Sequence, residues 1–197
     1  MAVDMDAVKD LRARTGAGVL DCKKALAECS GDIEKSVDFL REKGLAKAAK
    51  KVGRTASQGM VFSYIHTNGK IGVLVELNCE TDFVARTDEF QGLGHELAMQ
   101  VAAAIPQYVS VEDVDAQALE REKDIYRHQA LEEGKPAHIV DKIAEGRVKK
   151  YYEETCLLEQ AYIRDQEKRV KDLVMDAIAK LGENIVVRRF ARFSIGE

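Results

Sequence analysis

The sequence has no excess of positive charge. Its 30 lysine and arginine residues stand against 34 aspartate and glutamate residues, which gives a formal net charge of −4 and a pI of about 5.7. Because nucleic acids and anionic membrane surfaces are held largely by a positive field, we expect no direct partner of either kind. The basic and aromatic stretch RRFAR, residues 188–192, is more typical of the outer side of a sheet than of an RNA-binding surface.

Long apolar runs and closely paired cysteines are also absent. The longest apolar candidate, residues 97–105, is interrupted by Gln100 and falls well short of the roughly 18 residues that a membrane helix needs. The cysteines form no C-x-x-C pair, and the N-terminus does not resemble a secretory segment. We therefore expect a soluble protein of the reducing cytoplasm. With 197 residues, of which 46% are hydrophobic, the chain can form a substantial core.

Hydrophobic spacing predicts three short helices in the first fifty residues, because apolar positions recur at intervals of three and four. These positions are Val8 and Leu11; Val19, Cys22 and Leu26; and Ile33, Val37 and Leu40. Gly16 and Gly18 separate the first two helices, and Gly44 is expected to end the third. A basic linker helix should follow, and its charges either contact an acidic partner or face solvent. Those charges are Lys43, Lys47, Lys50, Lys51 and Arg54.

From Met60 the pattern becomes that of a sheet. Two runs of β-branched and aromatic residues flank Asn68-Gly69, a strong hairpin signal. The second run places Ile71, Val73, Val75 and Leu77 on one face and Leu74 on the other. Residues 184–195 are predicted to form a last strand, which must pair with this distant hairpin because two strands alone are marginally stable.

The segment between these strands is predicted to be helical. Helices are expected from Thr87 to just before Pro106, over residues 116–133, from about Pro136 through Tyr151, and over residues 170–181. The order of elements predicts an α+β fold. We expect a helical domain with its basic linker, residues 1–53, and a core α+β domain with an antiparallel sheet packed with helices, residues 54–197.

No catalytic arrangement is recognisable in the sequence. At His95 the stretch HELAM has Met99 where the zinc motif H-E-x-x-H needs a second histidine. Residues 14–25 lack the phosphate-loop pattern G-x-x-x-x-G-K-[ST]. Cys79 could be a nucleophile, but no histidine stands in a recognisable arrangement with it, which favours a buried structural thiol. We therefore predict a binding protein without catalytic residues, metal ligands or cofactors.

One short segment places an aromatic residue among polar ones. In NCETDFVAR, residues 78–86, a strand-like run breaks into Thr81-Asp82-Phe83-Val84. Phe83 can either fold back into the core or be presented to a partner, and the residues alone leave both alternatives open.

Five long motifs stand in order along the chain. They are LRARTGAGVLDCKKAL, GDIEKSVDFLREKGLAKAAKK, VELNCETDFVAR, GKPAHIVDKIAEGRVKKYYEE and GENIVVRRF. Together they closely resemble the elongation factor Ts family, whose members recycle elongation factor Tu in bacterial translation. The resemblance covers nearly the whole chain. It implies an N-terminal three-helix domain like the ubiquitin-associated domain and a core α+β domain, in agreement with the patterns above.

The resemblance also implies a mechanism. Family members bind the GDP form of elongation factor Tu, insert the T-D-F-V loop near the magnesium and phosphate site, and loosen GDP so that GTP replaces it. Phe83 would then anchor in a pocket between helices of the partner's G domain, and Asp82 would supply charge and hydrogen-bond acceptors. The residues that match family contacts with the partner are Thr81, Asp82, Phe83, Val84, His66, Arg12, Val19 and Leu20. His66 could instead be only a polar tip on the hairpin.

The chain departs from the long form of the family. The long form has two tandem core subdomains and a coiled-coil insertion, whereas this chain shows one core unit and no coiled coil, so it is similar to the short form. A homodimer would compensate by forming composite sites with Phe83 from one chain and His66 from the other. The sheet face that carries Val73 and Val75, or its neighbouring edge, is the expected seam.

The leading hypothesis is therefore a guanine-nucleotide exchange factor, not an enzyme, that binds elongation factor Tu in its GDP-bound and nucleotide-free forms. Two alternatives remain. One is a non-catalytic adapter like the ubiquitin-associated domain, and the other is a thiol enzyme that uses Cys79.

Overall fold

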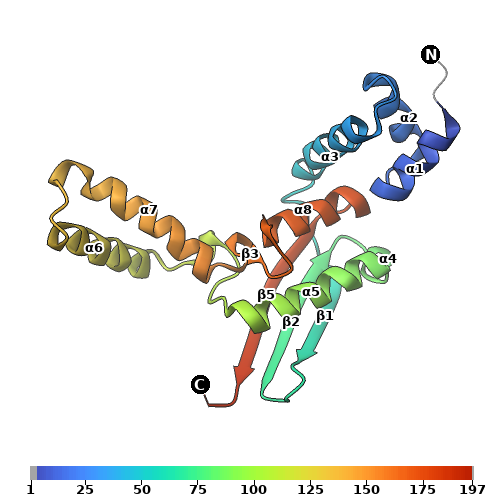
Figure 1. The fold of residues 1–197 in the computed structure, drawn as a ribbon. Coiled ribbons are helices and arrows are strands. Elements are labelled where there is room, and N and C mark those ends of the chain that lie inside the picture. Colours follow the sequence, from blue (N-terminus) through green and yellow to red (C-terminus); the bar gives the residue numbers. More distant parts are fainter. Residues whose placement is uncertain (1–3, 197) are drawn as a thin grey trace. The chain divides into compact units, whose positions relative to one another are not determined.

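The computed structural model describes residues 4–196 as a mixture of helices and an antiparallel sheet, which confirms the predicted α+β class (Figure 1). The described residues divide into two units. The first unit comprises the residues up to Gly59 together with Asn78–Phe90 and Val174–Val186. The second comprises Met60–Leu77, Gln91–Leu173 and the residues from Val187 onward. These units are not continuous in the sequence, and the expected domains 1–53 and 54–197 stay a prediction.

Three N-terminal helices form as predicted: α1 (Met5–Thr15), α2 (Val19–Glu28) and α3 (Ile33–Ala49). Each of the two aspartates that precede α1 and α3 caps its helix by accepting a backbone N–H, and Gly16, with φ +67°, ends α1. The apolar faces of the three helices share one core cluster. It contains Val8, Leu11, Cys22, Ala25, Leu26 and Leu40. The resemblance of these helices to a ubiquitin-associated domain stays a prediction.

The third helix does not end at Gly44, and this prediction is wrong. The helix continues to Ala49 because Leu, Ala and Lys follow the glycine, and these strong helix formers offset the cost of one glycine, about 1 kcal/mol. A Cβ atom at position 44 would lie 3.4 Å from the Cβ of Ala179 in α8 (Val170–Leu181). This is an ordinary van der Waals distance, so the packing of α3 on this part of α8 does not by itself require a glycine.

The expected basic linker helix forms only in part, since α3 ends at Ala49 and the charges from Lys50 onward follow it. Several of its lysines bind groups within the chain. Lys43 and Lys47 each pair with Asp21 at 3.3 Å, and Lys51 donates to the carbonyl of Gly182. These bonds favour the interpretation in which the charges need no acidic partner.

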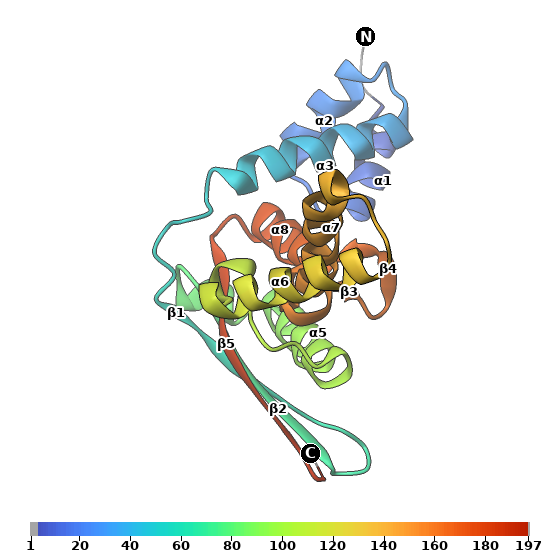
Figure 2. The same cartoon turned by 90° about the vertical axis from the view of Figure 1, so that its left-hand side faces the viewer.

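The sheet consists of β1 (Gln58–Ile65), β2 (Ile71–Cys79) and β5 (Ile185–Ser194), in the order β1-β2-β5 (Figure 2). The last strand therefore pairs with the distant hairpin, as predicted. α5 (Asp88–Ala104) runs along the sheet (Figure 1). Phe62 of β1 packs against this helix so closely that a Cβ atom at Gly94 would overlap the phenyl ring. Only glycine fits at that position.

The sheet face proposed as a dimer seam is not available. Val73 and Val75 are 2% and 0% exposed because this face is already covered within the chain, whereas Leu74 on the opposite face is 47% exposed. The expectation that Val73 and Val75 form the seam is therefore wrong. The other expected seam, a sheet edge, stays a prediction, since β1 and β5 are the outer strands of the described sheet.

A helical hairpin, α6 (Ala116–Glu132) and α7 (Ala137–Thr155), extends the second unit (Figure 1). Two helices joined by so short a turn must lie antiparallel, and Arg147 of α7 bridges back to Gln129 and Glu133 at 2.7 Å each. The sequence predicted both helices but no coiled coil. The structure corrects the expectation that the chain has nothing of this kind, because α6 and α7 form an antiparallel two-helix arm.

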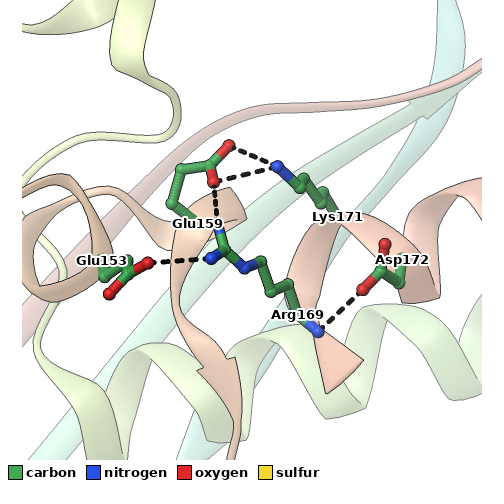
Figure 3. Close-up of polar contacts among 5 residues, drawn as sticks. All are labelled: Glu153, Glu159, Arg169, Lys171 and Asp172. Carbon is green, nitrogen blue, oxygen red and sulfur yellow. Dashed lines mark hydrogen bonds and ion pairs between the residues drawn. The ribbon is translucent and has the colours of Figure 1, made fainter. Parts of the chain in front are cut away.

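Two very short strands, β3 (Ala161–Tyr162) and β4 (Asp165–Arg169), were not predicted. Strands of two and five residues carry too little periodicity to be recognised. Charged contacts hold this segment against the end of α7 and the start of α8 (Figure 3). Other short elements are α4 (Asp82–Ala85) and the 3-10 helices η1 (Val111–Asp113) and η2 (Leu157–Glu159).

Candidate partner-binding site

A sharp turn after β2 exposes the side chain of Phe83. The strand ends at Cys79, and Thr81 then caps α4 with an extended backbone and a hydroxyl that accepts the N–H of Val84 at 3.4 Å. Phe83, the second residue of α4, is 77% exposed. The alternative in which Phe83 is a core residue is therefore wrong.

The other residues of α4 show how the turn is oriented. Ala85 is 3% exposed and anchors the inner side, while Val84 is half-buried. Asp82 lies beside Phe83 and forms an ion pair with Arg86 at 2.7 Å. A partner that approaches Phe83 would therefore also meet a carboxylate, although one already engaged by an exposed arginine.

One carboxylate that the sequence did not single out braces this turn. Glu183 lies between α8 and β5 and accepts three hydrogen bonds: from the N–H of Glu80 at 3.1 Å, the N–H of Thr81 at 2.9 Å, and the hydroxyl of Thr81 at 2.7 Å. The only signal in the sequence is the polar pair Glu183-Asn184 directly after a helix-ending glycine. Such a pair predicts a turn, not a contact with residues about a hundred positions earlier.

Bonds in the opposite direction complete the junction. The N–H of Asn184 donates to the carboxylate of Glu80 at 2.7 Å, and its side-chain amide donates to the carbonyl of Arg54 at 2.7 Å. Asn184 is only 2% exposed. The turn before Phe83 and the turn after α8 are thus cross-linked by several hydrogen bonds in one partly buried polar junction.

The N-terminal candidates lie around the turn between α1 and α2. Leu20 is 75% exposed and Val19 is 38% exposed, both in the first turn of α2. Arg12 is exposed in the last turn of α1. Two neighbouring apolar side chains left in solvent are compatible with a contact surface.

His66 lies at the tip of the β1–β2 hairpin. It is exposed, and its Nδ1 atom is 3.0 Å from the hydroxyl of Tyr64. This neighbour orients the ring on the surface. His66 belongs to the second unit, whereas the other seven candidate residues belong to the first. The eight residues therefore do not form one cluster within a single unit.

The environment of Cys79 opposes thiol chemistry. The residue is fully buried and its Sγ atom donates to the carbonyl of Thr81 at 3.0 Å. Burial, and next the negative charge of Glu183, raise the pKa of the Cys79 thiol. A nucleophilic cysteine needs the reverse, because the thiolate is the reactive form. Cys79 instead adds one more bond to the turn that presents Phe83.

Across residues 4–196, no three or more His, Cys, Asp or Glu side chains gather in a way that could hold a metal ion. None of the helices described between these residues has the length and apolar character needed to cross a membrane.

An α+β fold with an exposed aromatic on a braced turn, and without an activated thiol, has the features of a protein-binding factor. The family described as "Elongation factor TS" matches residues 20–197 of the chain. The chain belongs to the elongation factor Ts family, and its role is therefore that of a translation elongation factor in protein biosynthesis. The resemblance drawn from the five motifs is confirmed.

Similar proteins match the chain from end to end. The elongation factor Ts of Caldanaerobacter subterraneus subsp. tengcongensis is 65% identical over 195 residues, which cover 99% of this chain and 98% of that protein. That of Thermoanaerobacter pseudethanolicus is 63% identical, with coverage of 99% and 96%. That of Fervidobacterium nodosum is 56% identical over the full length of both proteins. The family assignment thus includes the segments around Phe83 and Glu183.

Proposed function

We propose that the protein is a guanine-nucleotide exchange factor that binds elongation factor Tu in its GDP-bound and nucleotide-free forms and promotes GDP release. The observation that carries this proposal is the braced turn on which Phe83 is 77% exposed. Burying an aromatic side chain in a partner's pocket is one of the strongest single contributions to an interface. Membership of the elongation factor Ts family supports a partner in translation elongation.

Exchange requires binding alone. If the factor binds the nucleotide-free partner more tightly than the GDP-bound partner, it must weaken GDP by the same ratio. Phe83 would supply apolar contact, and Asp82 would bring a negative charge and two acceptor oxygens close to the magnesium and phosphate site. No bond is made or broken, so the proposed factor has no catalytic residues, metal ligands or cofactor of its own and is not an enzyme.

The other candidates add to this contact. Thr81 and Val84 shape the turn, while Arg12, Val19 and Leu20 would add affinity through the partner's G domain. His66 would contribute from the second unit, either in the same chain or from the second chain of a homodimer. The proposed partner is a protein, so neither nucleic acid nor a membrane is a direct ligand, and the proposed location is the cytoplasm, where translation takes place.

The test is release of a fluorescent GDP from elongation factor Tu. We expect substoichiometric amounts of the factor to accelerate release, and Phe83→Ala to reduce this acceleration strongly. Leu131→Ala is a matched control, since Leu131 is a 51% exposed apolar side chain on α6, outside the proposed site. An unchanged release rate with the wild-type factor would favour the adapter or the thiol enzyme. Retained acceleration by a folded Cys79→Ala variant would exclude the latter.

A further inference from the structure

We propose that Glu183 is a positioning residue that holds the Phe83 turn in the conformation that binds the partner. This inference rests on the proposed function for its effect on exchange. Its structural part, that one carboxylate keeps the turn ordered, can be tested without any partner.

The contacts of Glu183 are concentrated on the entrance to α4. Its Oε2 atom accepts two consecutive backbone N–H groups, those of Glu80 and Thr81, and its Oε1 atom accepts the hydroxyl of Thr81. Hydrogen bonds to a charged acceptor are shorter and roughly twice as strong as those between neutral groups. Three of them converge on the two residues Glu80 and Thr81, which lie three and two positions before Phe83.

Helix formation and burial hold the turn only weakly. α4 has only four residues, and a helix of that length has no stability of its own. The cap bond from Val84 to Thr81 is long, at 3.4 Å, and Ala85 is the only fully buried residue of α4. Phe83 is mostly exposed to solvent and contributes little burial. Hydrogen bonds therefore carry much of the order of the turn, and Glu183 makes three of them, beside those from Cys79 to Thr81 and from Asn184 to Glu80.

The support for the Glu183 side chain is itself well fixed. Gly182, with φ +81°, ends α8 with its N–H bonded to the carbonyl of Ile178 at 3.0 Å. On the other side, Asn184 is buried and bonded to Glu80 and Arg54. A carboxylate held on both sides can order a flexible turn in advance, which lowers the entropic cost of binding.

The first test measures the turn in the free protein. The sequence contains no tryptophan, so Phe83→Trp introduces a single fluorophore at the relevant position. Time-resolved anisotropy should show a larger fast local rotation after Glu183→Gln, because one acceptor oxygen becomes an NH2 group. Glu89→Gln is the matched control, since Glu89 in the same unit pairs with Lys180 at 2.6 Å and not with the turn. Equal anisotropy decays in the two variants would overturn the proposal.

The second test asks whether Glu183 acts through Phe83. Glu183→Gln should raise the concentration for half-maximal GDP release roughly tenfold, and Glu89→Gln by less than about twofold. In a Phe83→Ala background, the further effect of Glu183→Gln should fall below about twofold. A merely structural role would give the same factor in both backgrounds and would contradict the inference. Melting curves identify the folded variants.

Two further outcomes separate the inference from the proposed function. If the wild-type protein does not accelerate GDP release, the proposed function fails, while the anisotropy result still decides whether Glu183 orders the turn. If release is accelerated but Glu183→Gln behaves like Glu89→Gln, the proposed function stands and the positioning role is wrong. Should Glu183→Gln fold poorly, Thr81→Val removes only the hydroxyl bonds and should change both readouts in the same direction by a smaller factor.

Discussion

Phe83 and Phe90 are two phenylalanines seven positions apart with opposite environments, 77% and 0% exposed. Truncating the exposed one removes little packing, so Phe83→Ala should leave the melting temperature nearly unchanged. It should weaken binding to elongation factor Tu by about 2 kcal/mol, roughly thirtyfold, because it removes the interface anchor. Phe90→Ala is the contrasting variant and should lower stability by roughly 3 to 5 kcal/mol. A melting curve and a GDP-release titration of each variant measure stability and partner binding separately. A large stability loss with Phe83→Ala would contradict the assignment of Phe83 as an interface residue.

At the scale of the element, the start of α2 should contribute to the affinity for elongation factor Tu and not to the maximal rate of GDP release. Leu20→Ser removes an apolar side chain that is 75% exposed, which leaves the three-helix core intact. The concentration of factor for half-maximal GDP release should rise severalfold, about 1 kcal/mol, while the maximal rate is kept. A variant that lowers the maximal rate at saturation would show that this element takes part in releasing GDP. Ala27→Ser, at another exposed position of α2, is a suitable control.

A second prediction at this scale concerns the charged contacts that η2 makes with the end of β4 and the start of α8. Glu159 accepts bonds from Arg169 at 2.6 Å and from Lys171 at 2.9 and 3.0 Å (Figure 3). Burial would raise the pKa of Glu159, but the bonds from Lys171 and Arg169 together lower it below its ordinary value of 4.5. The contribution of the Glu159 carboxylate to the stability of the folded protein is therefore fully present above the pKa that Glu159 has in the unfolded chain. It is lost as the pH falls through the lower pKa of the folded state.

Glu159→Gln should accordingly lower stability by about 1 to 2 kcal/mol near neutral pH. The difference in stability between this variant and the wild-type protein should shrink as the pH falls from about 5 to about 3. Thermal unfolding at several pH values would measure it. Glu34→Gln is the control, because Glu34 pairs with Arg14 on the surface with its side chain 76% exposed and should change little. A difference that stays constant with pH would contradict the role given to the Glu159 carboxylate.

At the scale of the whole molecule, Phe83 and His66 belong to different units of the chain. If a homodimer forms composite sites, Phe83→Ala and His66→Ala chains that are unfolded together and refolded should form mixed dimers. One site of each mixed dimer would then regain both side chains, so GDP release should recover part of the wild-type rate. Activity no higher than the mean of the separately refolded variants would remove the composite site. Sedimentation of each sample establishes whether dimers are present.

The sequence by itself determined the features that depend on neighbours along the chain. The boundaries of α8, Val170–Leu181, match the predicted range because hydrophobic spacing and a terminal glycine are local signals. The hairpin at Asn68-Gly69 formed for the same reason. The five motifs identified the family without reference to any contact. Even so, local rules failed at Gly44, where the helix formers that follow outweighed the glycine.

Only the tertiary structure decided which side chains are available to a partner. Phe83 could have been inside or outside, and its exposure follows from the turn that Thr81 and Glu183 hold together across 102 positions of sequence. Val73 and Val75 show the reverse, since their strand was predicted correctly but their face is covered. Burial and hydrogen bonding between distant segments depend on how the elements pack, and a pattern of neighbouring residues carries no information on that packing.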